Sequence, residues 1–190
     1  MFLAVGSAHG ILSGDNVTLG TAARQAALES AVTGAGNSFY GNKNAKAEVL
    51  NANVPFQAFG TWMELDELAG SNGNGANNIF KVNLTSGSWG SGDAAGTWEI
   101  LDTNFWTSYA YGAISLHVGG NTTADHFVWR LTPDKLSGTW AYDLISGGGS
   151  GLSNLKLYKA GKGTGVPDTG STLVPLGLGI GVLGFLKRRK

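Results

Sequence analysis

The 190-residue sequence predicts a mainly all-β protein, a two-layer antiparallel β-sandwich of jelly-roll-like type. From Thr61 onward, short segments alternate apolar and polar residues with a period of two, and Gly-, Ser- and Asn-rich turns separate them. The 31 Gly residues and the aromatic share of 10% fit long loops around a core of large rings, whereas a disordered chain lacks the aromatic residues. One or two short N-terminal helices and a C-terminal transmembrane helix are expected beside the sandwich.

The N-terminal third is expected to hold little of the sheet. Residues 1–10 resemble the end of a secretory signal peptide, with Gly6-Ser7-Ala8 as a small-residue cleavage site, although the positive n-region is missing. An ordinary disordered N-terminus is the alternative. The Ala-rich residues 20–32 predict a helix, and residues 44–54 predict a second short helix or an irregular stretch. The sandwich domain is placed at residues 11–158.

Seven strands are expected after Thr61, at residues 62–68, 79–84, 97–101, 113–118, 126–131, 139–145 and 152–158. Residues 71–78 predict a loop, because Gly, Asn and Ser fill them. The phase of the alternation predicts which side chains lie between the two sheets. They are Phe80, Val82, Trp98, Ile100, Leu116, Phe127, Trp129 and Leu155.

The tripeptide Gly-[Ser/Thr]-Trp occurs at residues 60–62, 87–89, 96–98 and 138–140. We interpret it as a Gly that lets the chain turn, followed by a large ring at the start of a strand. The irregular spacing of the four copies argues against a solenoid or a propeller.

The charge balance excludes one class of partner. Thirteen Lys and Arg match thirteen Asp and Glu, but four of the basic residues are the last four of the chain. The remaining body is therefore acidic, which argues against a nucleic-acid-binding surface. Cys is absent, so an exported domain of this sequence must gain its stability from its core, without disulfides.

No catalytic motif stands out. The sequence has no Ser/His/Asp signature, no G-x-S-x-G, no P-loop and no Cys/His cluster with metal spacing, so we expect no enzymatic activity, no cofactor and no metal. Strand phase puts His117 and His126 on the outer face of a predicted hairpin, as opposite or diagonal neighbours. We interpret them as exposed polar residues in preference to a two-ligand metal site.

Carboxylate residues suggest two further activities with weaker support, glycoside hydrolysis and calcium binding. Glu64, Asp66 and Glu67 form an acidic cluster, in which Glu64 and Asp66 are expected on one strand face at a spacing that glycoside hydrolysis can use. A solvated strand face is the preferred interpretation. Calcium binding through Asp66, Asp93 or Asp143 with loop carbonyls is conceivable.

Four aromatic residues in Gly/Ser-rich segments are candidates for ligand contact: Trp89, Trp106, Tyr109 and Tyr111. Aromatic platforms near Asn and Asp side chains are typical of sugar-binding β-sandwich modules. The alternative is that these rings fill the sandwich core or cap its ends.

The last 25 residues have three parts in fixed order. A turn-forming pentapeptide comes first, then a charge-free run at residues 172–186, then a basic stop. An apolar run that ends in basic residues predicts a membrane-inserted tail with its basic end in the cytoplasm, and places the rest of the chain across the membrane. Fifteen helical residues reach only about 22 Å, short of the ~30 Å hydrocarbon core, which suits a transient processing signal. The pentapeptide is Val166, Pro167, Asp168, Thr169 and Gly170, and the stop is Lys187, Arg188, Arg189 and Lys190.

This tail resembles the PEP-CTERM sorting signals of exosortase substrates, most of all the VPDSG-CTERM variety, with Thr169 where that variety has Ser. The resemblance implies export, transient residence in the inner membrane, cleavage in or next to the pentapeptide by an exosortase, and delivery to the cell surface or extracellular matrix. Residues 159–165 are expected to form a flexible linker before it. Sortase substrates, with LPXTG, share the order of parts and all of the motif except Leu; a plain C-terminal anchor is the third interpretation.

The body resembles, more loosely, the globular domain that often precedes such tails, through Ser137-Gly138-Thr139-Trp140 and the late strand at residues 151–158. The hypothesis is therefore an exported, non-enzymatic surface or matrix protein. Its expected partners are an exosortase-type enzyme and the membrane, with polysaccharide as a further candidate. The alternatives are a carbohydrate-binding surface module and a sortase-type wall-anchored protein.

Overall fold

The computed structural model describes residues 17–20, 23–42, 44–90, 92–119, 125–145 and 151–163. The elements in chain order are β1 (Val17–Gly20), β2 (Arg24–Leu28), β3 (Ser38–Gly41), α1 (Ala47–Ala52), α2 (Val54–Gln57), β4 (Met63–Ala69), β5 (Gly73–Asn74), β6 (Phe80–Gly87), β7 (Ala94–Ile100), α3 (Phe105–Ser108), β8 (Tyr111–Val118), β9 (Asp125–Arg130), β10 (Ser137–Leu144) and β11 (Leu152–Ala160).

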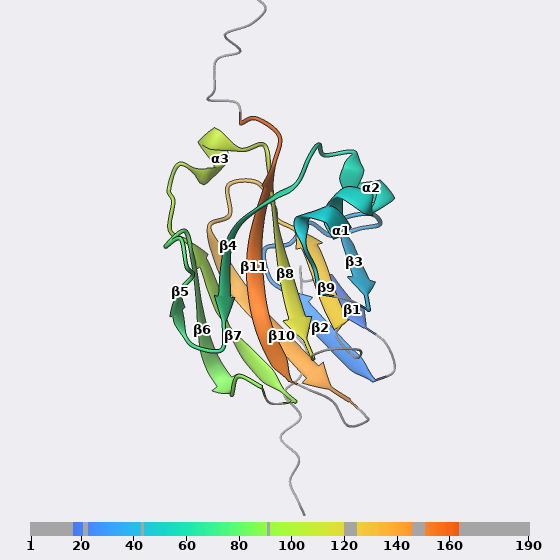
Figure 1. The fold of residues 1–190 in the computed structure, drawn as a ribbon, viewed down its shortest axis with the longest axis vertical. Helices are drawn as coiled ribbons and strands as arrows, with labels where there is room; N and C mark the ends of the chain where they lie inside the picture. The colour runs from blue at the N-terminus through green and yellow to red at the C-terminus, as the bar shows by residue number, and fades with distance from the viewer. Residues whose placement is uncertain are drawn as a thin grey trace, which may run out of the picture.

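Two antiparallel sheets face each other, which confirms the predicted two-layer sandwich. The first has six strands in the order β1-β2-β10-β7-β6-β5, and the second has five in the order β3-β9-β8-β11-β4. Figure 1 shows the five-stranded sheet in front, with α1 and α2 lying on its outer face. β2 pairs with β10 and β3 pairs with β9, although these strands are far apart in the sequence, and β4 pairs with β11.

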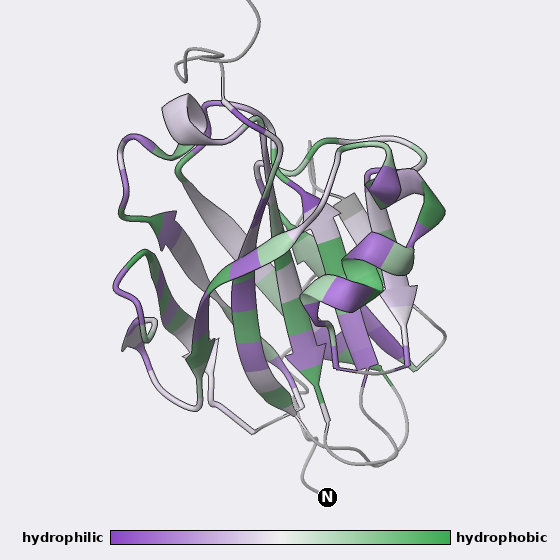
Figure 2. Ribbon diagram, turned by 45° about the horizontal axis from the view of Figure 1, so that its top comes forward, coloured by the Kyte–Doolittle hydropathy of each residue, from purple (hydrophilic) through white to green (hydrophobic). Residues whose placement is uncertain are grey.

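The core between the sheets consists of the side chains that the alternation predicts. All eight predicted core residues are at most 2% exposed and belong to one hydrophobic cluster. Figure 2 shows the alternation of hydrophobic and hydrophilic residues along the strands. Burial of rings as large as Trp98 and Trp129 is the dominant stabilising contribution expected in a chain without cysteines.

A second, smaller cluster covers part of the outer face of the five-stranded sheet. Leu50 and Phe56, from α1 and α2, are fully buried there against Val128 and Tyr158 of the sheet. The Trp62 indole donates to the backbone carbonyl of Phe56 at 2.8 Å, which fixes the turn after α2. The helix predicted at residues 44–54 is thus confirmed as α1, with α2 directly after it.

The helix predicted at residues 20–32 is wrong, because β2 lies there. Ala26 lies opposite the buried Tyr142 and Ala27 opposite Ala141, while β1 pairs with the other edge of β2. Alanine's helix propensity is a weak preference that tertiary contacts override. Here its small side chain fits beside a tyrosine ring, and both edges of the segment gain hydrogen bonds from neighbouring strands.

The structure changes the bounds of two further predicted segments, and two others lie outside the residues that it describes. The predicted loop at residues 71–78 contains the two-residue strand β5, and the predicted linker begins inside β11, which extends to Ala160. Residues 1–10 and the predicted helix at residues 173–186 lie outside the described residues. Within the ranges that the structure describes, no helix has the length and apolar character of a membrane span.

Candidate functional site

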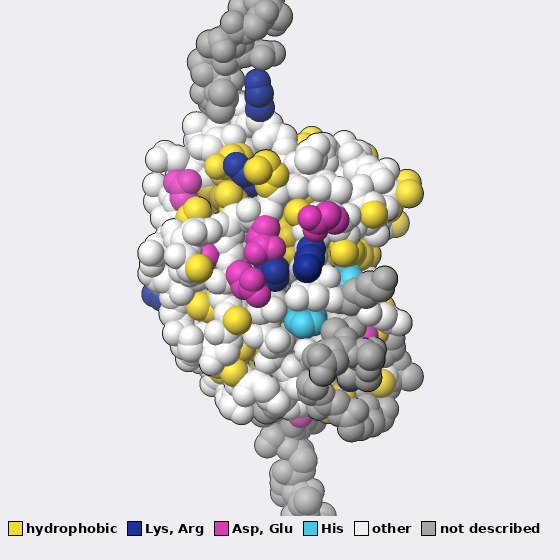
Figure 3. All heavy atoms as spheres, in the orientation of Figure 1, with side chains coloured by type: hydrophobic (Ala, Val, Ile, Leu, Met, Phe, Trp, Pro, Cys, Tyr) yellow, Lys and Arg dark blue, Asp and Glu magenta, His cyan; other side chains and the backbone are white. Residues whose placement is uncertain are grey.

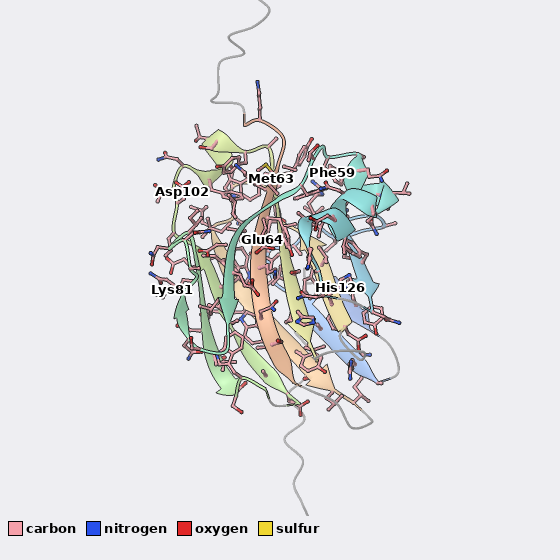
Figure 4. All side chains as sticks on the ribbon, in the orientation of Figure 1. Phe59, Met63, Glu64, Lys81, Asp102 and His126 are labelled. Atoms are coloured by element: carbon pink, nitrogen blue, oxygen red, sulfur yellow. The ribbon has the colours of Figure 1, made fainter. Side chains whose placement is uncertain are left out.

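A hollow of about 400 Å³ lies on the outer face of the five-stranded sheet, beside α1. It combines aromatic, aliphatic and polar side chains from β3, β9 and the α1–α2 segment. Figure 4 labels His126 on the strand that forms its floor. The lining residues are Phe39, Tyr40, Gly41, Glu48, Val49, Ala52, Asn53 and His126.

The shape of this hollow follows from two residues of the edge strand β3. Gly41 lies opposite His126, and a Cβ on Gly41 would collide with the imidazole ring, so the ring occupies the space left by the missing side chain. Phe39 packs edge-on against both His126, at 5.7 Å between ring centroids, and Phe56, at 4.9 Å. Phe39 thereby joins the helical cover to the floor of the hollow.

His117 and His126 are direct neighbours across β8 and β9, as strand phase predicts. The expectation that they are exposed is wrong, because they are only 5% and 2% exposed. Burial, the adjacent His126 and the nearby Lys156 ammonium lower the pKa of His117. Nδ1 of His117 lies 3.4 Å from the side-chain amide of Asn154. Among the described residues no group of three or more metal-ligating side chains accompanies the pair.

A charged row lies next to the histidines on the same outer face. Lys156 is 6% exposed, and its ammonium lies 3.0 Å from Glu64 and 3.2 Å from Glu67. Figure 3 shows acidic, basic and histidine side chains gathered on this face of the molecule. Two carboxylates bound to one buried ammonium form an ion-pair network.

Asp66 does not share a face with Glu64, contrary to the prediction. The register between β4 and β11 shifts at this point, so Glu64 lies opposite Tyr158 and Asp66 opposite Leu157. A bulge of this kind reverses the alternation of side chains beyond it. The Asp66 carboxylate therefore points inward and accepts backbone N–H groups from Glu67, Asn77, Ile79 and Phe80 at 2.9 Å each.

The calcium candidates are dispersed. Asp66 is saturated by N–H donors, which suit an anion and leave it no role as a cation ligand. Asp93 accepts the backbone N–H of Leu144 at 2.8 Å, on the six-stranded sheet. Asp143 lies opposite Gln25 in the same sheet, so these carboxylates do not form one site with Asp66.

The four predicted ligand-facing aromatics are half-buried and lie at two ends of the sandwich. Trp89 donates to Asn72 at 3.1 Å beyond the end of β6. Trp106, Tyr109 and Tyr111 lie on or next to α3, where the Trp106 indole donates to the carbonyl of Lys135 at 2.8 Å. Their faces also pack on the two hydrophobic clusters, so they do not form a single platform.

The chain leaves the sandwich beside α3. After β11, Gly161 adopts a φ of 67°, and the backbone N–H of Gly163 donates to the carbonyl of Ser108 at 3.1 Å. A Cβ on Gly60 would lie 3.7 Å from the N of Gly161, so the turn before β4 meets this exit too. We call the residues gathered here, 58–63, 101–111, 131–136 and 159–163, the α3 end.

Comparison with known proteins concerns the segment that follows this exit. Residues 165–190 match the family model described as the VPDSG-CTERM motif. The chain carries a VPDSG-CTERM tail. Comparison with the curated proteins and with the solved structures finds no match. The predicted pentapeptide and basic stop of the VPDSG-CTERM tail lie outside the described residues.

Sequence reasoning found the VPDSG-CTERM tail but missed the hollow. Its wall and floor come from Phe39 and His126, which are far apart in the sequence and meet only because β3 pairs with β9. The four residues of β3 are too few for a period-two pattern to be recognised. The available signal was Gly41 at the end of a short aromatic segment, which marks a close approach of another group.

Proposed function

We propose that this protein is exported, that an exosortase-type enzyme recognises and cleaves its VPDSG-CTERM tail, and that the sandwich is delivered to the cell surface or extracellular matrix without enzymatic activity. The observation that carries the proposal is the match of residues 165–190 to the VPDSG-CTERM motif. Its position after the last strand supports it, because only Thr164 and Gly165 separate the described sandwich from Val166.

The backbone chemistry of the pentapeptide suits proteolysis. Pro167 restricts Val166 to extended conformations, which protease clefts accept, and Gly170 can take a positive φ. The apolar residues 172–186 would enter the membrane, and the basic residues 187–190 would stay in the cytoplasm. The cleavage site would then lie at the outer surface of the membrane, on the same side as the sandwich.

Mass spectrometry of the surface protein from a host with a working exosortase tests the proposal. We expect a C-terminus near Thr169 and loss of the apolar run. Pro167→Ala should slow maturation while membrane insertion persists, and Pro55→Ala, exposed at the start of α2, is the matched control. Deleting residues 172–190 should release soluble protein. An intact Lys190 on surface protein would reduce the tail to a plain anchor, and processing that depends on a sortase would favour the alternative enzyme.

The hollow beside α1 favours a second candidate function, glycan binding. Its volume lies within the usual range of small-molecule sites. Phe39 offers apolar ring surface for the C–H faces of a sugar, and Glu48 and Asn53 offer carboxylate and amide groups for its hydroxyls. This combination replaces the four aromatic residues that the sequence predicted as ligand contacts.

A glycan array probed with the full chain tests this second candidate. Val49→Arg would fill the hollow, and it should abolish binding to any glycan that the unmodified protein retains. Val54→Arg is the matched control, because Val54 is 76% exposed on α2 outside the lining. Equal binding by both variants would place the glycan elsewhere, and an array without signal would remove the candidate.

A further inference from the structure

We propose that the α3 end is a docking surface for anionic phospholipid, which holds the sandwich against the membrane while the tail is processed. The inference rests on the proposed function, since it assumes that the tail enters the membrane. The proposed surface consists of described residues at the end of the sandwich where the chain continues beyond β11. Three observations carry it: apolar and aromatic exposure, local charge, and the length of the tether.

The α3 end exposes side chains that suit a membrane interface. Met63 is 55% exposed, and Trp106, Tyr109 and Phe59 are half-buried. Figure 4 labels Met63 and Phe59 beside this exit, and Figure 3 shows hydrophobic side chains around a basic one in the same region. Trp and Tyr gather at membrane–water interfaces, because their rings are apolar and their N–H or O–H groups are polar.

The charge of this end is opposite to that of the body. It carries two carboxylates and three lysines, with Arg130 stacked over Phe59 at 4.3 Å. The Lys159 ammonium lies 4.2 Å from the Tyr109 ring centroid, so a cation and an aromatic ring form one unit. Excess positive charge beside interfacial aromatics favours anionic headgroups. The charged residues are Asp102, Asp134, Lys135, Lys159 and Lys162.

The tether to the apolar run starts at this end of the sandwich. Residues 164–171 separate Gly163 from the apolar run, and a fully extended chain of that length reaches about 30 Å. That is close to the length of β11 itself, nine residues at about 3.3 Å each. Because Gly163 is hydrogen-bonded to α3, the first part of the sandwich to reach the bilayer is the α3 end.

Lipid quenching of a single fluorophore on the full chain tests the proposal. The natural sequence contains no cysteine, so Thr107→Cys, exposed on α3, gives a unique label. Thr85→Cys, exposed toward the far end of β6, is the matched control. The protein is reconstituted in vesicles of mixed zwitterionic and anionic phospholipid that carry a headgroup-level quencher. We expect strong quenching at position 107 and little at position 85.

Charge variants identify the lipid. Lys159→Gln and Lys162→Gln should each lower the ratio of docked to undocked sandwich by about fivefold, whereas Lys46→Gln, outside the α3 end, should not change it. Vesicles of zwitterionic lipid alone should reduce quenching at position 107. Equal quenching at both positions, or quenching that is independent of lipid charge, would overturn the docking proposal.

Flotation of the vesicles distinguishes failure of tail insertion from failure of docking. Protein that does not float with the vesicles contradicts tail insertion, and protein that floats without quenching at position 107 contradicts docking alone.

Discussion

Gly96 on β7 lies directly opposite Trp140 on β10, and the indole of Trp140 occupies the space that a side chain on Gly96 would fill. The reciprocal relationship holds between Gly138 and Trp98. Two copies of the Gly-[Ser/Thr]-Trp repeat therefore interlock, each supplying the gap for the other's ring. Their glycines lie inside strands and do not serve as turns, which corrects the interpretation of the repeat for these two copies.

Gly96→Ala should lower the free energy of unfolding by about 3 kcal/mol or prevent folding. Its Cβ would lie 2.8 Å from the Trp140 ring and would also meet the backbone carbonyl of Asn83, which cannot move aside. Gly92→Ala is the control, because its Cβ would meet only the flexible side chain of Leu144, at 3.2 Å. Urea unfolding followed by tryptophan fluorescence measures both. A Gly96→Ala protein as stable as Gly92→Ala would contradict the interlocked arrangement.

Asp66→Ala should be among the most destabilising single substitutions of a carboxylate in this chain. It would leave four backbone N–H groups without their acceptor, of which that of Phe80 is fully buried, at a cost of about 3 kcal/mol. Glu99→Gln, which breaks only the surface pair with Lys81, should cost less than ~0.5 kcal/mol. Thermal unfolding compares the two. Similar melting temperatures for both variants would show that Asp66 does not stabilise the backbone at Asn77, Ile79 and Phe80.

The strands were predictable and the positions of the functional groups were not. Alternation located every long strand and the buried face, because large apolar residues recur at every second position, as at Phe80 and Val82 and at Trp98 and Ile100. The bulge between Glu64 and Asp66 has no signature in this pattern, so the faces of the acidic cluster were assigned wrongly.

Burial of the histidines could not be predicted either. Whether the outer face of the sheet is open depends on what covers it, and Phe39 with α1 covers His126 from a distant part of the sequence. The VPDSG-CTERM tail is the opposite case, since the order of its parts along the chain is itself the signal. Contacts between segments that are far apart in the sequence leave no local sequence pattern, whereas a sorting signal is itself a local sequence pattern.

Stability should fall when the pH drops below about 6.5, the usual pKa of histidine. Burial, then His126 and Lys156, lower the pKa of His117 in the folded protein, so the unfolded chain binds more protons between that value and 6.5. The stability loss therefore develops as the pH falls through 6.5 and ends below the folded pKa. His117→Asn should flatten this part of the profile of urea midpoint against pH. A variant with the same slope as the unmodified protein would assign the pH dependence to other groups.

Tyr158→Phe tests how the helical cover is attached to the sheet. The Tyr158 hydroxyl is buried, donates to the carbonyl of Ala45 at 3.0 Å and lies 3.2 Å from the Ser115 hydroxyl; burial raises its pKa, so it stays protonated and can donate throughout the neutral range. Removing it leaves a buried carbonyl without its donor, at a cost of about 1–2 kcal/mol. Because Ala45 lies two residues before α1, the loss should concentrate there. Hydrogen exchange should speed up at residues 45–57 and stay unchanged in β7 and β10. Uniform acceleration across both sheets would show instead that Tyr158 supports the whole sandwich, and that the cover has no separate attachment.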